Sequence, residues 1–161
     1  MVILGVDPGL HYCGYAIIQK EGNKATLLNY GYLSLSPSKT VASRLSEIHS
    51  FFGDSISKYN ITHISFETPF LGKNAQNFLK LGYVRGILYL LAHNHGLIIT
   101  EFSPREIKQS LTGYGAAGKD QVARVILALF PRMEKPKKED VTDALAVTLC
   151  GLWKHSKSQN C

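Results

Sequence analysis

The sequence has 161 residues, 45% of them hydrophobic, which is enough to bury the core of one domain. Eighteen Lys and Arg against 12 Asp and Glu give a formal net charge of +6, which favours a polyanionic partner without bearing on the fold. Three scattered cysteines with no CxxC spacing argue against a disulfide framework and a zinc site, and they fit a reducing compartment.

The first part of the chain predicts three strands joined by hairpins. Residues 2–6 form a continuous apolar run, typical of a strand that is buried on both faces of a sheet. Asp7 ends this run, so we expect neither a signal peptide nor a membrane span, which needs about 20 apolar residues, and we expect a cytoplasmic protein. A loop rich in turn formers leads to a second strand at 15–18 and a third at 25–35.

Beyond residue 40 the predicted elements alternate between helices and strands. Apolar residues that recur every three or four positions predict an amphipathic helix over about 40–59. A short β-rich run at 63–67 and a long helical pattern at 74–94 follow it. The remaining expected elements are a strand at 97–102, helices from Pro104 and over 119–130, a lysine-rich connection at 135–138, and a helix over 140–153.

Hairpin-linked strands followed by strands that alternate with helices predict an α/β fold, a five-stranded mixed sheet flanked by helices. We assign residues 1–155 to a single domain and residues 156–161 to a short disordered tail. The crossover helix should place the fourth strand parallel to the first, so that their carboxyl ends are neighbours about 4.8 Å apart. Open α/β sheets tend to carry their functional sites at this edge.

Acidic residues end both of these neighbouring strands, Asp7 the first and Glu67 the fourth. Either acid alone could be a solvated strand end or a cap for the turn that follows. Two carboxylates brought together, however, repel each other unless a cation lies between them. The pair therefore indicates a metal site.

The last predicted helix adds a second acidic pair, Asp140 and Asp143, which are three residues apart and share a helix face. Asp140 could instead be the N-cap, with Asp143 a first-turn acid favoured by the helix dipole. The small residues Ala144 and Ala146 beside Asp143 favour a helix that lies close to the sheet. Four carboxylates from three distant segments would then converge.

A cage of oxygen ligands alone suits Mg²⁺ or Mn²⁺ and not zinc. Its natural chemistry is phosphodiester hydrolysis by two metals about 3.5–4 Å apart, one activating water and the other stabilising the leaving 3′ oxygen. The basic composition supports this interpretation, because a phosphate backbone rewards Lys and Arg contacts.

Four segments match, in order and in spacing, the motifs of one known family. They are Asp7-Pro8-Gly9 with Gly14, then 66–70 with 73–75 and 79–86, then 108–122, and finally 140–147. This set resembles the RuvC-type Holliday junction resolvases over nearly the whole chain. The first motif alone would be weak evidence, whereas the four together are specific.

The resemblance implies a ribonuclease H-like fold and a homodimer that makes paired, symmetric nicks in four-way DNA junctions during recombination and repair. It also implies Mg²⁺ as the cofactor, two ions per subunit, with Mn²⁺ able to substitute, and a branch-migration motor complex as a partner. Carried over by position, the catalytic acids and metal ligands are Asp7, Glu67, Asp140 and Asp143.

The resemblance also points to four residues that would contact DNA. Lys108 and the catalytic Lys119 match basic residues beside the active site, and we infer that they hold or neutralise the scissile phosphate; otherwise they are solvated lysines. Phe70 matches an aromatic position that lies against unpaired bases, where stacking contributes about 1–3 kcal/mol per base. On sequence alone Phe70 would more often be a core residue. Lys73 is expected to contact DNA nearby.

Two glycines, Gly82 and Gly86, lie one turn apart in the long helix predicted over 74–94. Each costs about 1 kcal/mol relative to Ala, so a close backbone approach to another element is expected there. The resemblance implies that this element belongs to the second subunit at the dimer interface. In a monomer the glycines would serve packing within the chain.

Three other interpretations remain open. Asp7-Pro8-Gly9 before a hairpin also resembles the phosphate loop of actin-like sugar kinases and chaperone ATPases, which need a second domain of similar size. A junction-binding module without catalysis is disfavoured, because acids repel DNA unless metals neutralise them. Other ribonuclease H-like nucleases, including enzymes that cut RNA–DNA hybrids, are the closest competitors, and Phe70 and the dimer helix distinguish a junction resolvase from them.

Overall fold

A computed structural model describes residues 1–69 and 75–157, so that Phe70 and Lys73 lie outside the described residues. The strands in the described part of the chain are β1 (Val2–Asp7), β2 (Tyr12–Glu21), β3 (Lys24–Ser34), β4 (His63–Glu67) and β5 (Ile98–Phe102). The helices are α1 (Val41–Tyr59), α2 (Ala75–Asn94), α3 (Pro104–Thr112), α4 (Lys119–Leu129) and α5 (Glu139–Lys157). None of the described helices combines the length and the apolar character that crossing a membrane requires.

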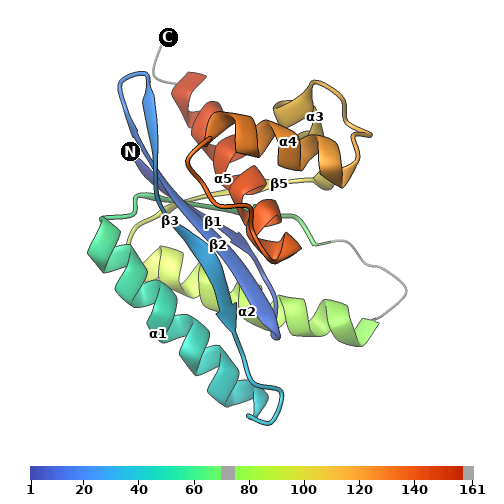
Figure 1. The fold of residues 1–161 in the computed structure, drawn as a ribbon. Helices are drawn as coiled ribbons and strands as arrows, with labels where there is room; N and C mark the ends of the chain where they lie inside the picture. The colour runs from blue at the N-terminus through green and yellow to red at the C-terminus, as the bar shows by residue number, and fades with distance from the viewer. Residues whose placement is uncertain (70–74, 158–161) are drawn as a thin grey trace.

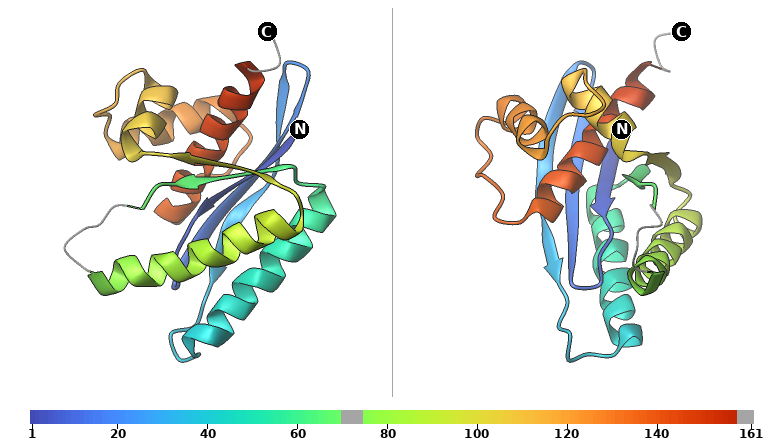
Figure 2. Two further views of the ribbon diagram at one scale, coloured as in Figure 1. Left: turned by 180° about the vertical axis from the view of Figure 1, so that it is seen from behind. Right: turned by 90° about the vertical axis from the view of Figure 1, so that its right-hand side faces the viewer.

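The five strands form one mixed sheet, as expected, and their order is β3-β2-β1-β4-β5. The pairs β1–β2 and β2–β3 are antiparallel, whereas β1–β4 and β4–β5 are parallel. Helices α1 and α2 cover one face of the sheet, and α3, α4 and α5 cover the other (Figures 1 and 2). The architecture therefore has three layers with the sheet in the middle.

The central strand β1 supplies buried side chains to both faces, which explains its continuous apolar sequence. Leu4 and Val6 pack into the core beneath α1 and α2, together with Phe52. Ile3 points the other way and packs with Leu145 of α5. Since neighbouring strand residues alternate between faces, a strand covered on both sides needs apolar residues at every position.

Helix α5 lies unusually close to the sheet because glycine occupies the contact positions. A Cβ on Gly14 would lie 2.0 Å from the main-chain oxygen of Asp140. A Cβ on Gly5 would lie 2.6 Å from the main-chain oxygen of Ala144, which is fully buried. The expectation that this helix lies close to the sheet is confirmed, and the glycines of β1 and β2 make room for it in addition to Ala144.

Two elements, β2 (Tyr12–Glu21) and α5 (Glu139–Lys157), extend several residues beyond the ranges predicted from the sequence. Strand β2 begins at Tyr12 rather than at residue 15, because it pairs with β1 as far as Asp7 opposite Gly14. Helix α5 continues to Lys157, so residues 156 and 157 are not part of a disordered tail. This last turn is held by His155, whose Nε2 hydrogen-bonds Thr100 Oγ1 at 2.8 Å.

The glycines of α2 do not pack closely within the chain. A Cβ added to Gly82 or Gly86 would meet no atom within 4 Å among the described residues, so the expectation of close packing within a monomer is wrong. The outer side of α2 also leaves large side chains in solvent, with Leu79 55%, Tyr83 43% and Leu90 49% exposed. This side of the helix is free to contact another molecule.

Replacing Gly14 with Ala should destabilise the protein by about 1–3 kcal/mol, because the added methyl group must push the α5 backbone away from β2. Gly53→Ala in α1 is the matched control, since its Cβ would meet only Leu91 Cδ2 at 3.8 Å. That control should gain up to about 1 kcal/mol from helix propensity. Urea unfolding of both variants checks the prediction, and equal stability of Gly14→Ala and the parent protein would contradict it.

Candidate active site

The structure brings the two strand-end acids side by side. Val6 of β1 pairs with Phe66 of β4 in parallel register, so Asp7 and Glu67 leave adjacent strands at the same end of the sheet. Both side chains are partly buried. Asp140 and Asp143 lie in the first turns of α5, directly above the β1–β2 pair that ends at Asp7 and Gly14.

Burial and the neighbouring negative charges raise the pKa values of three of the acids, Asp7, Glu67 and Asp143. The pKa of Asp7 is raised to about 8, first by burial and then by the charges of Asp143, Asp140 and Glu67, with Lys119 acting in the opposite direction. Burial and the charge of Asp143 also raise the pKa of Glu67. The pKa of Asp143 is raised by burial against the opposing effect of Lys119. Burial and the repulsion between the acids therefore outweigh the attraction of the neighbouring lysines.

The carboxylates of the four acids suit a divalent cation, although their present positions do not form a complete coordination site. Among the described residues, no three His, Cys, Asp or Glu side chains are arranged tightly enough to hold an ion without movement. The four acids nevertheless offer only oxygen donors, which suits Mg²⁺ or Mn²⁺. Partly buried carboxylates that repel one another are stabilised when a cation binds between them.

Asp140 does not occupy the capping position that the sequence left open. Helix α5 begins at Glu139, so Asp140 is its second residue and lies inside the helix. Its carboxylate contributes to the raised pKa of Asp7. The position of Asp140 therefore favours a role beside Asp143 over a role as the N-cap.

Two lysines adjoin the acids, as the sequence predicted. Lys119 Nζ lies 2.6 Å from Glu139 Oε2 and 3.8 Å from Asp143 Oδ2. These contacts raise the pKa of Lys119, the hydrogen bond to Glu139 most of all. The positive charge of Lys108 partly offsets the rise in the pKa of Glu67. Both lysines line a cavity of about 280 Å³ that Glu67 and Asp143 also border.

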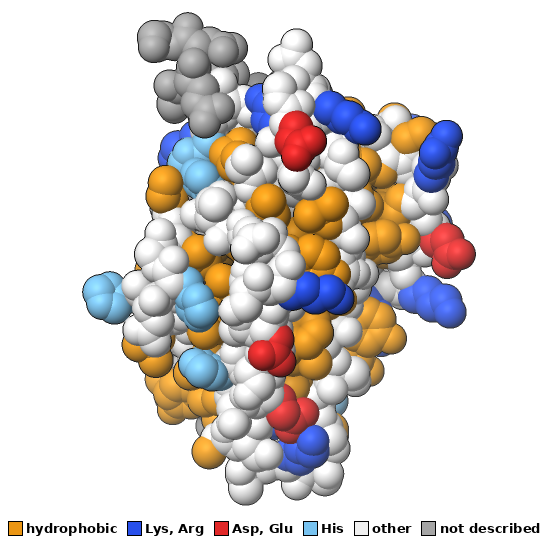
Figure 3. Space-filling model, turned by 90° about the vertical axis from the view of Figure 1, so that its left-hand side faces the viewer, with side chains coloured by type: hydrophobic (Ala, Val, Ile, Leu, Met, Phe, Trp, Pro, Cys, Tyr) orange, Lys and Arg blue, Asp and Glu red, His pale blue; other side chains and the backbone are white. Residues whose placement is uncertain are grey.

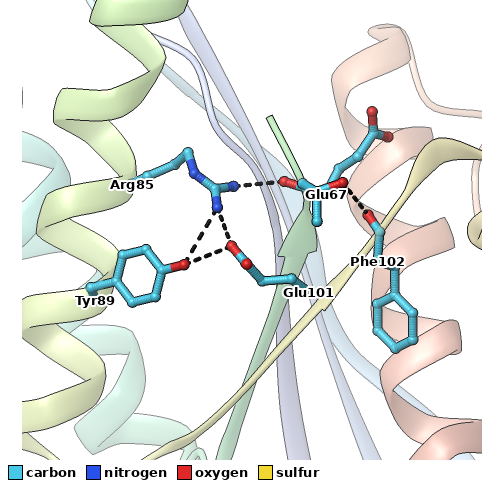
Figure 4. A network of polar contacts seen from close by, with 6 residues as sticks. Glu67, Arg85, Tyr89, Glu101 and Phe102 are labelled. Atoms are coloured by element: carbon cyan, nitrogen blue, oxygen red, sulfur yellow. Dashed lines mark hydrogen bonds and ion pairs between the residues drawn. The ribbon is translucent and has the colours of Figure 1, made fainter. Parts of the chain in front are cut away.

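A buried arginine behind Glu67 was not anticipated from the sequence. Arg85 of α2 is only 8% exposed, and its Nη1 donates a hydrogen bond of 2.6 Å to the main-chain oxygen of Glu67. Its Nη2 forms an ion pair with Glu101 of β5, which also accepts a 2.7 Å hydrogen bond from Tyr89 Oη (Figure 4). The guanidinium lies over the Phe66 ring, 4.8 Å from its centroid.

Through this network α2 contacts Glu67 at the end of β4 and Glu101 in β5. Sequence signals for it existed but were weak. Arg85 and Tyr89 are four residues apart on one helix, and Glu101 interrupts an otherwise uncharged strand. A charged residue on a helix is usually solvated, and nothing in the sequence pairs it with an acid on a distant strand. Glu139, which binds Lys119, was missed for the same reason.

Comparisons with known proteins agree with this geometry. The family model described as crossover junction endodeoxyribonuclease RuvC matches residues 3–151. RuvC of Halothermothrix orenii is 41% identical over 150 residues, which are 93% of this chain and 91% of the relative. RuvC of Pelodictyon phaeoclathratiforme is 42% identical over 152 residues, which are 94% of this chain and 80% of that relative.

A solved structure shares the fold across the whole domain. Thermus thermophilus RuvC in complex with a Holliday junction substrate superposes with a TM-score of 0.91 at 26% identity, over 98% of this chain and 96% of that one. This match confirms the ribonuclease H-like α/β fold. The chain belongs to the RuvC family of crossover junction endodeoxyribonucleases.

Proposed function

We propose that this protein is a structure-selective DNA endonuclease that resolves four-way junctions by paired, symmetric nicks in recombination and repair. The observation that carries the proposal is the group of four acids flanked by Lys108 and Lys119 at one end of the sheet. Family membership supports the nuclease chemistry. The junction-bound Thermus thermophilus relative supports four-way junction DNA as the substrate.

In this proposal Asp7, Glu67, Asp140 and Asp143 hold Mg²⁺, two ions per subunit, and Mn²⁺ can substitute. Bound ions of this kind activate water and stabilise the charge that develops on the leaving oxygen. The oxygen-only donor set and the mutual repulsion of the acids support the assignment. The chain's own contribution is to fix four carboxylates on two strand ends and one helix.

The lysines hold the phosphate that is cut. The pKa of Lys119 is raised, so its side chain stays positively charged at the pH at which DNA is cut. Its ion pair with Glu139 is exposed on both sides and is therefore weak. A DNA phosphate that enters the cavity can replace Glu139 as the partner of Lys119. Lys108 faces the same cavity beside Glu67 and offers a second positive charge.

Phe70 and Lys73 follow β4 within six residues of Glu67, outside the described residues. We assign Phe70 to stacking on unpaired bases at the junction centre and Lys73 to a phosphate contact. Their proximity in sequence to Glu67 supports both assignments, because β4 ends at Glu67.

Two subunits are proposed to pair through α2, which would set the two active sites to cut in a symmetric way. The exposed Leu79, Tyr83 and Leu90 and the open space around Gly82 and Gly86 support this surface. Glycine allows the backbone of a partner helix to approach closely.

The resemblance further suggests a branch-migration motor complex as a partner. We place the activity in the cytoplasm, where thiols stay reduced. The free, buried thiols of Cys13 and Cys150 support that location.

Purified protein should nick a synthetic mobile four-way junction symmetrically with Mg²⁺ and leave it intact with EDTA. Matched duplex and RNA–DNA hybrid should stay uncut under both conditions. Asp140→Asn and Asp143→Asn should each lower the cleavage rate by roughly 100-fold or more while junction binding persists. Cleavage of the hybrid in place of the junction would assign another substrate. Tight junction binding without any cleavage would contradict the nuclease assignment.

Asp7→Asn should stabilise the metal-free protein at pH 8. The pKa of Asp7 rises from 3.8 to about 8 on folding, so between these values the folded state binds more protons than the unfolded chain. Stability therefore falls as the pH rises through this window. Asn removes that loss, and the variant should exceed the parent by at least about 1.4 kcal/mol at pH 8, the equivalent of one pKa unit, and match it near pH 4.

Urea unfolding in EDTA across this pH range measures the difference. Asp54→Asn, which changes an exposed acid of α1, is the matched control and should follow the parent profile. Adding Mg²⁺ should stabilise the parent more than Asp7→Asn. Parallel pH profiles for the parent and Asp7→Asn would refute the proposed crowding of charge.

Gly86→Arg should convert a dimer into a monomer without unfolding the chain. The single chain has open space at this position, whereas a helix packed against it has none. Ser50→Arg adds the same side chain to an exposed position of α1 and should leave the dimer intact. Sedimentation equilibrium reports the mass against that of one 17.8 kDa chain. A monomeric parent protein, or a dimeric Gly86→Arg, would refute the α2 interface.

A further inference from the structure

A second basic surface adjoins the acids, on the side of β1 that faces away from β4. It consists of residues that we call the tyrosine–lysine face: Tyr12, Tyr32, Lys135, Lys137 and Lys138. Tyr12 opens β2, Tyr32 lies on the edge strand β3, and the lysines belong to the connection before α5. None of these residues has a role in the function proposed above.

Aromatic and basic side chains touch one another on this face. Lys138 Nζ lies 3.9 Å from the centroid of the Tyr12 ring. The Tyr12 ring in turn meets the Tyr32 ring edge to face, with 5.6 Å between centroids. Tyr32, Lys135 and Lys137 border a hollow of about 170 Å³ between β3 and the connection. Lysines interleaved with tyrosines form the kind of surface that binds nucleic-acid backbones.

Among the described residues, no ion pair joins a lysine of the face to an acid. Lys135 and Lys137 are exposed, and Tyr32 is 41% exposed. Glu134 is the acid that borders the same hollow. Glu139, the next acid along the chain, is engaged by Lys119. In Figure 3, which views the molecule from the side of β3 and α1, lysine and arginine side chains lie among hydrophobic ones over the upper and right-hand parts.

The tyrosine–lysine face lies next to the acids at which DNA is proposed to be cut. Lys138 stands two residues before Asp140, and the main chain of Asp140 rests against Gly14, two residues after Tyr12. Lys108 and Lys119 lie with Glu67 and Asp143 on the other flank of the acids. The sheet order β3-β2-β1-β4 thus leaves the acids between two basic surfaces. A phosphate backbone that crosses the acids can contact both.

We propose that the tyrosine–lysine face binds the sugar–phosphate backbone of one duplex arm of the junction, on the side of the scissile phosphate away from α2. The inference rests on the proposed function and extends it to a further DNA contact. The lysines pair with phosphates, and the exposed Tyr32 ring packs against the sugars. Such contacts position DNA and add affinity without reading its sequence.

The paired variant Lys135→Ala/Lys137→Ala tests the proposal by salt dependence. Junction binding is measured by fluorescence anisotropy in EDTA at several salt concentrations. Each lost phosphate contact reduces the slope of log K against log salt by about 0.9, so the double variant should lose about 1.8. Tyr32→Ala should weaken binding at every salt concentration and leave the slope unchanged, because it removes no charge.

Lys39→Ala/Lys58→Ala is the matched control, since it removes the same charge near α1. Lys58 stands over the Tyr59 ring at 5.0 Å, as Lys138 does over Tyr12, but it has no place beside the acids. This control should keep the parent slope. If Lys135→Ala/Lys137→Ala shows the same slope of log K against log salt as the parent protein, and the parent protein cuts junctions, the face does not contact DNA. The proposed function is then unaffected.

A plain duplex separates the face from the proposed function. If the parent protein does not cut junctions but Lys135→Ala/Lys137→Ala still lowers the slope for duplex by about 1.8, the face is supported as a DNA contact and the resolvase assignment fails. Thermal unfolding of each variant confirms that the changes act on binding, because both lysines are exposed.

Discussion

The contact of α5 with β1 and β2 is the constraint on which the site depends. Glycine at positions 5 and 14 lets the backbone of α5 approach β1 and β2 so closely that no Cβ atom fits at either position. Asp140 and Asp143 are thereby held above the strand end that carries Asp7. A methyl group at Gly14 would push α5 away from β2 and so separate Asp140 and Asp143 from Asp7, although none of these acids is itself replaced.

This proximity concentrates negative charge in a partly buried place. The raised pKa of Asp7 reflects the free energy that it costs to hold a carboxylate in a buried place and, after that, among other acids. The cores on both faces of the sheet supply the opposing stability, since apolar side chains of β1 pack above and below the same strand. The fold thus holds the proposed cation site in a form that is unfavourable without a bound cation, an arrangement common at functional sites.

Much of this arrangement follows from local sequence patterns. The apolar run before Asp7 predicts a strand covered on both faces, and the strand-end positions of Asp7 and Glu67 follow from strand order. Asp140 and Asp143 are paired by helix periodicity alone. Each of these features depends on residues that are close in sequence or that lie at the end of a strand or helix. The local pattern of apolar and acidic residues therefore predicts where they lie.

The features that could not be predicted depend on pairing between distant segments. The start of β2 is set by its register with β1 and not by the residues at 12–14, which are rich in turn formers. The open space at Gly82 and Gly86 among the described residues contradicts close packing within the chain, which the two glycines alone could not decide. The contact of Lys138 with Tyr12 joins segments more than a hundred residues apart, and no periodicity reports it.

Arg85 gives α2 a second task besides its proposed place between subunits. Its guanidinium joins the helix to the main chain of Glu67, so a shift of α2 moves the peptide that carries this proposed catalytic acid. In a dimer joined through α2, subunit association and occupancy of the acids then become thermodynamically linked. Such linkage is reciprocal, so whatever tightens one active site alters by the same factor the affinity of the two chains for each other.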